Sequence, residues 1–290
     1  MFPETFTNLV NTVEQYAKKG SYEYRWRLNA IEGSVPDNCL NGYPFATPAG
    51  VGVRLAYRKG NLAVTADLNS NPEATWRDFL PSILWKTLTK DQKHLFQLRL
   101  AEPPEGIREE TVGEKMVPSF AYTLLHPSFT FTSESQFLDG FNSIITATTR
   151  LSSRDQIGVS TIYDPSRTGV KDYTFAFSRV GCNAVKGGDI VAKYNAIHGI
   201  ALHMRIPVNR FASAVIVAEK SRFIVGADSR SSCGAQMMMN VNLVNEEATL
   251  SIVKNLVDMW KITMSYSTLL RGGVAAVPKF GIVFSSQDSS

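Results

Sequence analysis

The sequence predicts an all-β protein that forms a single transmembrane antiparallel β-barrel. Apolar and polar residues alternate in segments of strand length nearly from end to end of the 290-residue chain, and a strand places alternate residues on opposite faces. The apolar face is nearly free of charge, while the other face collects Arg and Lys. No run approaches the ~18 apolar residues of a spanning helix, so this chain would cross a membrane with strands.

The composition describes an ordered chain. Apolar residues make up 44% and charged residues 19% of it, which excludes a disordered protein. The mean hydropathy of −0.09 suits a membrane barrel as well as a soluble protein, because a barrel exposes only every second residue to lipid. The net charge of +4 comes without a block of Lys and Arg, so nucleic acid is not an expected partner. The three scattered cysteines predict reduced thiols rather than a disulfide framework.

The first residues follow a helical rather than a strand pattern. Between Pro3 and Lys18 the apolar residues recur at offsets of three and four, at Phe6, Leu9, Val10 and Val13. Gly20 follows this segment and is a common helix stop. We therefore expect a short amphipathic helix within residues 1–20 and one barrel domain over residues 21–290.

The period changes to two after Gly20, and residues 51–58 show it clearly. One face carries Val51, Val53, Leu55 and Tyr57, and the other carries Gly52, Arg54, Ala56 and Arg58. The short turn Lys59–Asn61 leads to the next alternating run, which predicts a hairpin. Runs of this kind are about nine to eleven residues long and number roughly sixteen to nineteen.

The alternation lapses between residues 70 and 119. The segment Pro72–Thr89 could be helical, and residues 102–115 have the composition of an exposed polar loop. No linker rich in Pro, Gly and Ser divides the chain, so we expect one domain here as well.

The alternation alone leaves two interpretations open. In a soluble sandwich the apolar faces pack against each other and the polar face is solvated. In a membrane barrel the apolar face contacts lipid and the polar face lines a water-filled lumen. The strand length and the aromatic residues near strand ends favour the barrel.

The barrel interpretation makes the basic residues of the polar face candidates for a pore lining. These candidates are Arg25, Arg27, Arg54, Arg58, Lys193, Arg205 and Lys261. Positive charge along a lumen lowers the barrier for anions and raises it for cations. Screening acts over ~8 Å at physiological salt, so in a wide pore the preference would be graded.

The sequence offers no group for enzymatic chemistry. It contains no phosphate-binding loop and no nucleophile elbow. His198 and His203 lie five residues apart on a predicted strand, which puts them on opposite faces and argues against a metal site. We therefore expect no enzyme activity, no cofactor and no metal.

Both ends of the chain resemble the mitochondrial porins, the voltage-dependent anion channels. The start is similar in Pro3–Leu9 and in Lys18–Tyr22, where the family has a Pro-x-Thr-aromatic-x-x-Leu helix and a Lys-Gly-aromatic approach to the first strand. Residues 221–227 resemble a late strand of the family. The end resembles the last-strand sorting signal of mitochondrial barrels in Lys279, Gly281, Ile282 and Phe284. The family's glycine-rich hinge after the helix is reduced here to Gly20, with Glu23 and Arg25 following.

This resemblance implies a barrel of about 19 strands with the N-terminal helix in its lumen. It implies a channel of the mitochondrial outer membrane that passes anions and small metabolites by diffusion. The protein-conducting pore of the outer-membrane import translocase shares the fold and the terminal signal, and it remains an alternative, as does a barrel that anchors a larger organelle assembly. The implied partners are membrane lipid, small anions and metabolites, and either further copies of the chain or small helical membrane subunits.

Overall fold

The computed structural model describes most of the chain. The described residues are 2–18, 27–29, 37–47, 50–70, 79–89, 91–101, 117–138, 140–164, 169–257, 260–270 and 278–286. They form one sheet of 19 strands and one α-helix near the N-terminus. The predicted all-β class and the short N-terminal helix are therefore confirmed. The helix α1 covers Phe6–Lys18.

The strands follow one another along the chain from β1 to β19. The first part of the sheet contains β1 (Arg27–Asn29), β2 (Cys39–Thr47), β3 (Gly50–Lys59), β4 (Leu62–Asn69), β5 (Ser82–Leu88), β6 (Lys93–Ala101), β7 (Val117–Leu125), β8 (Phe129–Leu138), β9 (Gly140–Arg150) and β10 (Asp155–Asp164). The second part contains β11 (Gly169–Cys182), β12 (Gly188–Asn195), β13 (Gly199–Pro207), β14 (Ala212–Glu219), β15 (Arg222–Arg230), β16 (Gln236–Asn242), β17 (Glu247–Val257), β18 (Trp260–Leu269) and β19 (Lys279–Ser286).

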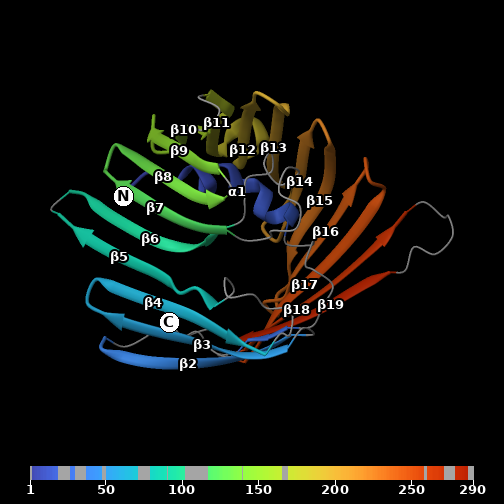
Figure 1. Cartoon of the computed structure of the whole chain (residues 1–290). Coiled ribbons are helices and arrows are strands. Elements are labelled where there is room, and N and C mark those ends of the chain that lie inside the picture. Colours follow the sequence, from blue (N-terminus) through green and yellow to red (C-terminus); the bar gives the residue numbers. More distant parts are fainter. Residues whose placement is uncertain are drawn as a thin grey trace.

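The sheet is antiparallel and its order follows the chain. From β2 to β19 each strand pairs with the next in sequence. The three-residue β1 pairs antiparallel with β2 and parallel with β19. The sheet curves into a barrel-like shape around an interior (Figure 1).

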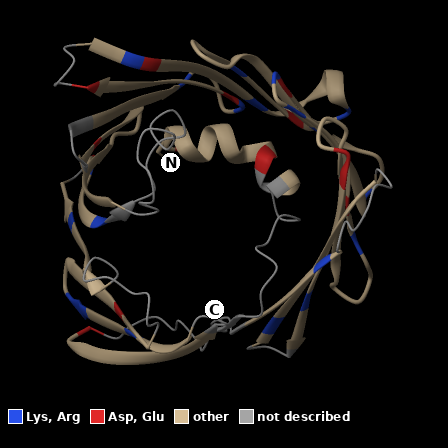
Figure 2. Cartoon of the chain, turned by 45° about the vertical axis from the view of Figure 1, so that its right-hand side comes forward, with Lys and Arg blue, Asp and Glu red and all other residues tan. Residues whose placement is uncertain are grey.

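The helix α1 lies inside this curved sheet. It contacts the inner side of the wall from β9 to β16, and Figure 2 shows it within the space that the strands surround. The N-terminal half of the helix lies nearer β9 to β11, since Phe6 and Leu9 pack on Ala176 of β11. Residues that touch α1 mark the inward face of β9 to β16, and their sequence neighbours face outward. The cross-strand pairing extends this assignment to the other strands.

The distribution of side chains between the two faces is unusual for a folded chain in water. Large apolar residues are exposed on the outward face, among them Ile200 at 77% and Val51 at 61% exposure. Polar residues are buried on the inward face, where His203 and Ser251 are 0% exposed. In a soluble protein large apolar side chains are mostly buried in the core and polar side chains are mostly exposed.

The prediction that Pro72–Thr89 could be helical is wrong for the part of this segment that the structure describes, residues 79–89. Ser82–Leu88 forms strand β5 instead of a helix. Leu84 breaks the alternation on the inward side, which hid the strand in the sequence. Cross-strand contacts decide the structure here, since Trp85 pairs with Leu62 and stacks on Phe96 with 5.3 Å between ring centroids. The predicted polar loop at 102–115 lies outside the described residues.

Among the described residues no helix is long and apolar enough to span a membrane.

Candidate functional site

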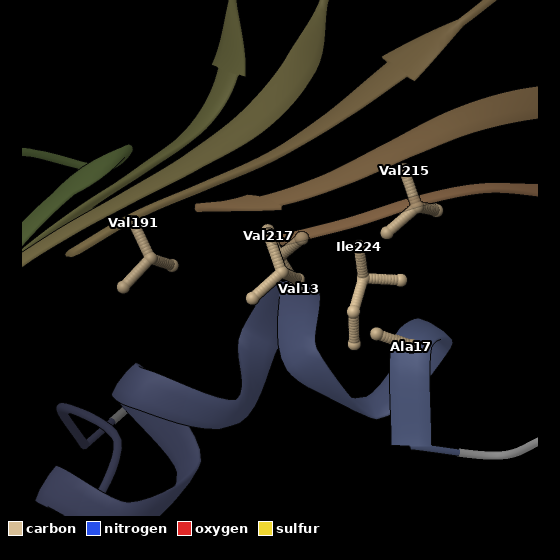
Figure 3. Close-up of a cluster of buried hydrophobic side chains, with 6 residues drawn as sticks. All are labelled: Val13, Ala17, Val191, Val215, Val217 and Ile224. Carbon is tan, nitrogen blue, oxygen red and sulfur yellow. The ribbon is translucent and has the colours of Figure 1, made fainter. Parts of the chain in front are cut away.

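The candidate site is the inward face of the sheet where α1 is attached to it. Val13 and Ala17 of the helix pack into a buried apolar cluster with wall residues from β12, β14 and β15, which are Val191, Val215, Val217 and Ile224 (Figure 3). The helical stripe predicted from the sequence lies on this side, because Phe6, Leu9 and Val13 are buried and Val10 packs against Phe6 and Leu9. The apolar side of α1 therefore faces the wall.

Hydrogen bonds hold the segment that precedes the helix. The Thr130 hydroxyl donates to the Pro3 carbonyl at 2.8 Å, and the Thr148 hydroxyl donates to the Glu4 carbonyl at 2.5 Å. The Glu4 amide donates to Gln156 Oε1 at 3.1 Å. Each neutral hydrogen bond of this kind adds about 0.5–1.5 kcal/mol, so the start of the helix is tied to β8, β9 and β10.

Asn240 of β16 holds the other end of the helix. Its side-chain amide donates to the Ala17 carbonyl at 3.2 Å and to the Tyr16 carbonyl at 3.4 Å. The last carbonyls of a helix have no partner within it, so this amide supplies one. Gly226 on the neighbouring strand makes room for Asn240, because a Cβ at Gly226 would collide with Asn240 Oδ1. Arg205 adds a cation–π contact, with its guanidinium carbon 4.5 Å from the Tyr16 ring centroid.

A cluster of charges links the middle of the helix to the wall. Arg222 pairs with Glu14 of the helix at 2.8 Å and with Glu219 at 2.9 Å. Glu219 also accepts from Lys193 at 2.7 Å and contacts His203 Nε2 at 2.9 Å. Glu14 is 5% exposed, so its charge needs compensation of the kind that Arg222 supplies.

Carboxylates balance several of the predicted pore-lining residues. Arg54 forms a bidentate pair with Asp67 at 2.7 and 2.9 Å, and Lys193 pairs with Glu219. Arg205 lies 3.6 Å from the carboxylate of Asp189. The inward face is therefore less positive than its Arg and Lys residues alone suggest.

Two further candidates differ from these pairs. Arg58 is exposed and Lys261 is half-buried, and neither has a carboxylate partner among the described residues. Arg25 lies outside the described residues. Arg27 belongs to β1, but its side chain is not described.

The residues of the predicted sorting signal lie on β19 next to β1. Lys279 and Gly281 pair with Ser267 and Ser265 of β18. Ile282 and Phe284 alternate with Gly281 and point to the opposite, outward side. The signal itself stays a prediction.

One small cavity opens between the helix and the strand turns. It has a volume of about 250 Å³ and is bounded by Phe6 and Val10 on one side and by Lys193, His198 and Lys220 on the other. No group of three His, Cys, Asp or Glu side chains in the described part of the chain could hold a metal ion.

Two comparisons of this chain with known proteins find no match. No protein-family model matches it, and no curated protein matches it either. The class that the fold defines is an all-β protein with a barrel-like antiparallel sheet and a helix attached to its inner wall.

The attachment of the helix can be tested by removing one charge. Glu14→Gln should weaken docking of α1 by about 1.5–3 kcal/mol, because Arg222 then loses a charged partner. Hydrogen exchange measured over residues 6–18 would rise accordingly. Lys186→Gln is the control, since this exposed lysine forms no ion pair among the described residues and does not border the cavity beside the helix. Equal exchange in Glu14→Gln and the unmodified protein would contradict the role given to this pair.

Proposed function

We propose that the protein is a channel of the mitochondrial outer membrane that passes anions and small metabolites by diffusion. The observation that carries the proposal is the reversed distribution of side chains, with apolar residues outward and polar residues inward. A bilayer is the surroundings in which this distribution is stable. An exposed apolar surface of this extent would cause aggregation in water.

The strand pairings support a closed barrel. A sheet that crosses a bilayer must not leave an open edge, because unpaired backbone groups in hydrocarbon cost several kcal/mol each. The three-residue β1 pairs with β2 and with β19, the two strands at which such a barrel would close. Closure through this short strand is part of the proposal.

The attached helix favours small solutes over polypeptides as the cargo. It is held at both ends and in the middle by Thr130, Asn240 and Arg222. A helix fixed in this way occupies part of the interior and narrows the path. We therefore favour the metabolite channel over the protein-conducting alternative. The mitochondrial location rests on the resemblance of the chain ends to the mitochondrial porins.

Insertion can be tested with two neighbouring residues of β17. Leu250 faces outward and Thr249 faces inward in the register with β16 and β18. Leu250→Arg should reduce the membrane-inserted fraction, since Arg on the lipid face costs about 2–4 kcal/mol near the bilayer midplane. Thr249→Arg should insert like the unmodified protein. The measurement is resistance to alkaline carbonate extraction, and equal resistance of both variants would argue against a lipid-facing Leu250.

Ion selectivity can be tested by comparing unpaired and paired charges. Neutralising Arg58 and Lys261 together should reduce the anion preference in a graded way, because each change removes one positive charge from the lumen. Arg54→Gln combined with Asp67→Asn removes an ion pair without changing the net charge, so selectivity should stay the same. Reversal potentials across planar bilayers in a salt gradient measure both. An initial cation preference, or no conductance, would overturn the proposed function.

The orientation of the strands can be tested with the exposed cysteines. Cys39 begins β2 and Cys233 lies in the turn after β15, and the antiparallel order puts both at the same end of the sheet. A membrane-impermeant maleimide should label single-cysteine variants of both from the same side of the membrane. Labelling from opposite sides would contradict the proposed topology.

The pH dependence of this labelling has a structural cause. Ser231 Oγ lies 2.8 Å from Cys233 Sγ, and hydrogen bonding to Ser231 lowers the pKa of the Cys233 thiol. The reactive thiolate therefore forms at a lower pH than in an ordinary cysteine. Ser231→Ala should shift the rise of the labelling rate to higher pH, and an unchanged pH profile would contradict the role given to Ser231.

A further inference from the structure

An apolar groove runs along the outward face of β8 to β13. Its volume is about 760 Å³. Large side chains border it, including Phe175 at 54% and Ile200 at 77% exposure. The small residues Ala147 and Ala192 lie between them and leave the space open.

The groove approaches one end of the sheet, where basic residues gather. Phe177 borders the groove, and Arg179 lies two residues further on the same side of β11. Arg154 stands in the adjacent turn between β9 and β10, and its side chain reaches the Gly181 carbonyl at 3.4 Å. Arg154 and Arg179 are both exposed.

The arginines keep the capacity to bind an anion. Asp155 engages Nε and Nη2 of Arg179 at 2.7 and 3.0 Å, and Nη1 has no hydrogen-bond partner among the described residues. Asp155 neutralises one of the two guanidinium groups, so the Arg154–Asp155–Arg179 group keeps a net positive charge. Guanidinium groups bind phosphate through strong charge-assisted hydrogen bonds.

We propose that this groove and the two arginines bind one anionic phospholipid. The acyl chains would lie in the groove, and the headgroup phosphate would contact Arg154 and Arg179. The charge at the rim and the apolar lining below it match the two parts of such a lipid. The inference rests on the proposed membrane location, since only there does the outward face meet lipid.

Binding can be measured on the full chain in a neutral detergent by native mass spectrometry. The probes are phosphatidylglycerol and phosphatidylcholine with identical acyl chains. Phosphatidylglycerol should be retained at least about tenfold more strongly. Arg154→Gln combined with Arg179→Gln should abolish this preference, whereas Ala192→Phe should weaken binding of both lipids by filling the groove. Ala192→Phe leaves the charges intact, so it still tests the site if the arginine variant does not fold.

A matched control removes two other basic residues from the same end of the sheet. Arg210 lies in the turn between β13 and β14 and Lys254 lies on β17; both are exposed and neither lines the groove, so Arg210→Gln with Lys254→Gln should keep the preference. If the control variant loses the preference for phosphatidylglycerol to the same extent, the preference reflects general attraction between the basic protein surface and anionic lipid, and the proposed site is overturned. Displacement of the lipid by glycerol 3-phosphate would indicate a free-phosphate site and overturn it too. If lipid binding is not selective but the protein conducts ions, the lipid site is refuted and the proposed channel is not. If the protein does not conduct ions but binds the lipid selectively, the proposed channel is refuted and the lipid site is not.

Discussion

The period of two in each strand is the constraint on which the rest of the structure depends. Because every strand pairs with its neighbours in chain order, the inward residues of one strand meet the inward residues of the next. A shift of one residue would move Val217 out of the helix contact and Ile216 into it. The apolar outer face, the polar inner face and the docking surface for α1 therefore all depend on the same strand register.

The helix and the wall depend on each other through contacts of different kinds. Apolar packing at Val13 and Ala17 holds the helix against the wall, but this interaction is non-directional and does not fix the position of the helix. The hydrogen bonds from Thr130 and Asn240, together with the Glu14–Arg222 pair, fix where along the wall the helix lies. The same inward positions supply both the anchors of α1 and the charges that a solute would meet, so the helix position and the charge pattern of the interior are linked.

Local patterns in the sequence predicted the local structure. The alternation in residues 51–58 and the helical spacing from Phe6 to Val13 both match the structure. The Arg54–Asp67 pair follows from the hairpin register across the turn at Gly60. The sequence could not reveal the Glu14–Arg222 pair, because that contact joins elements distant in the chain. Strand β5 was not predicted because Leu84 interrupts the alternation of apolar and polar residues. Packing against the neighbouring strands, which the local sequence does not show, forms the strand there.

The central claim is that the outer face of the sheet contacts lipid while the inner face contacts water. Nitroxide spin labels placed singly along β4, from Leu62 to Leu68, test it directly after reconstitution into liposomes, because α1 packs against other strands. Labels at even-numbered positions should collide mainly with oxygen, which concentrates in the bilayer, and labels at odd-numbered positions mainly with a water-soluble nickel chelate. Nickel accessibility at the even-numbered positions would contradict a lipid-facing outer surface, and so would a loss of the two-residue period.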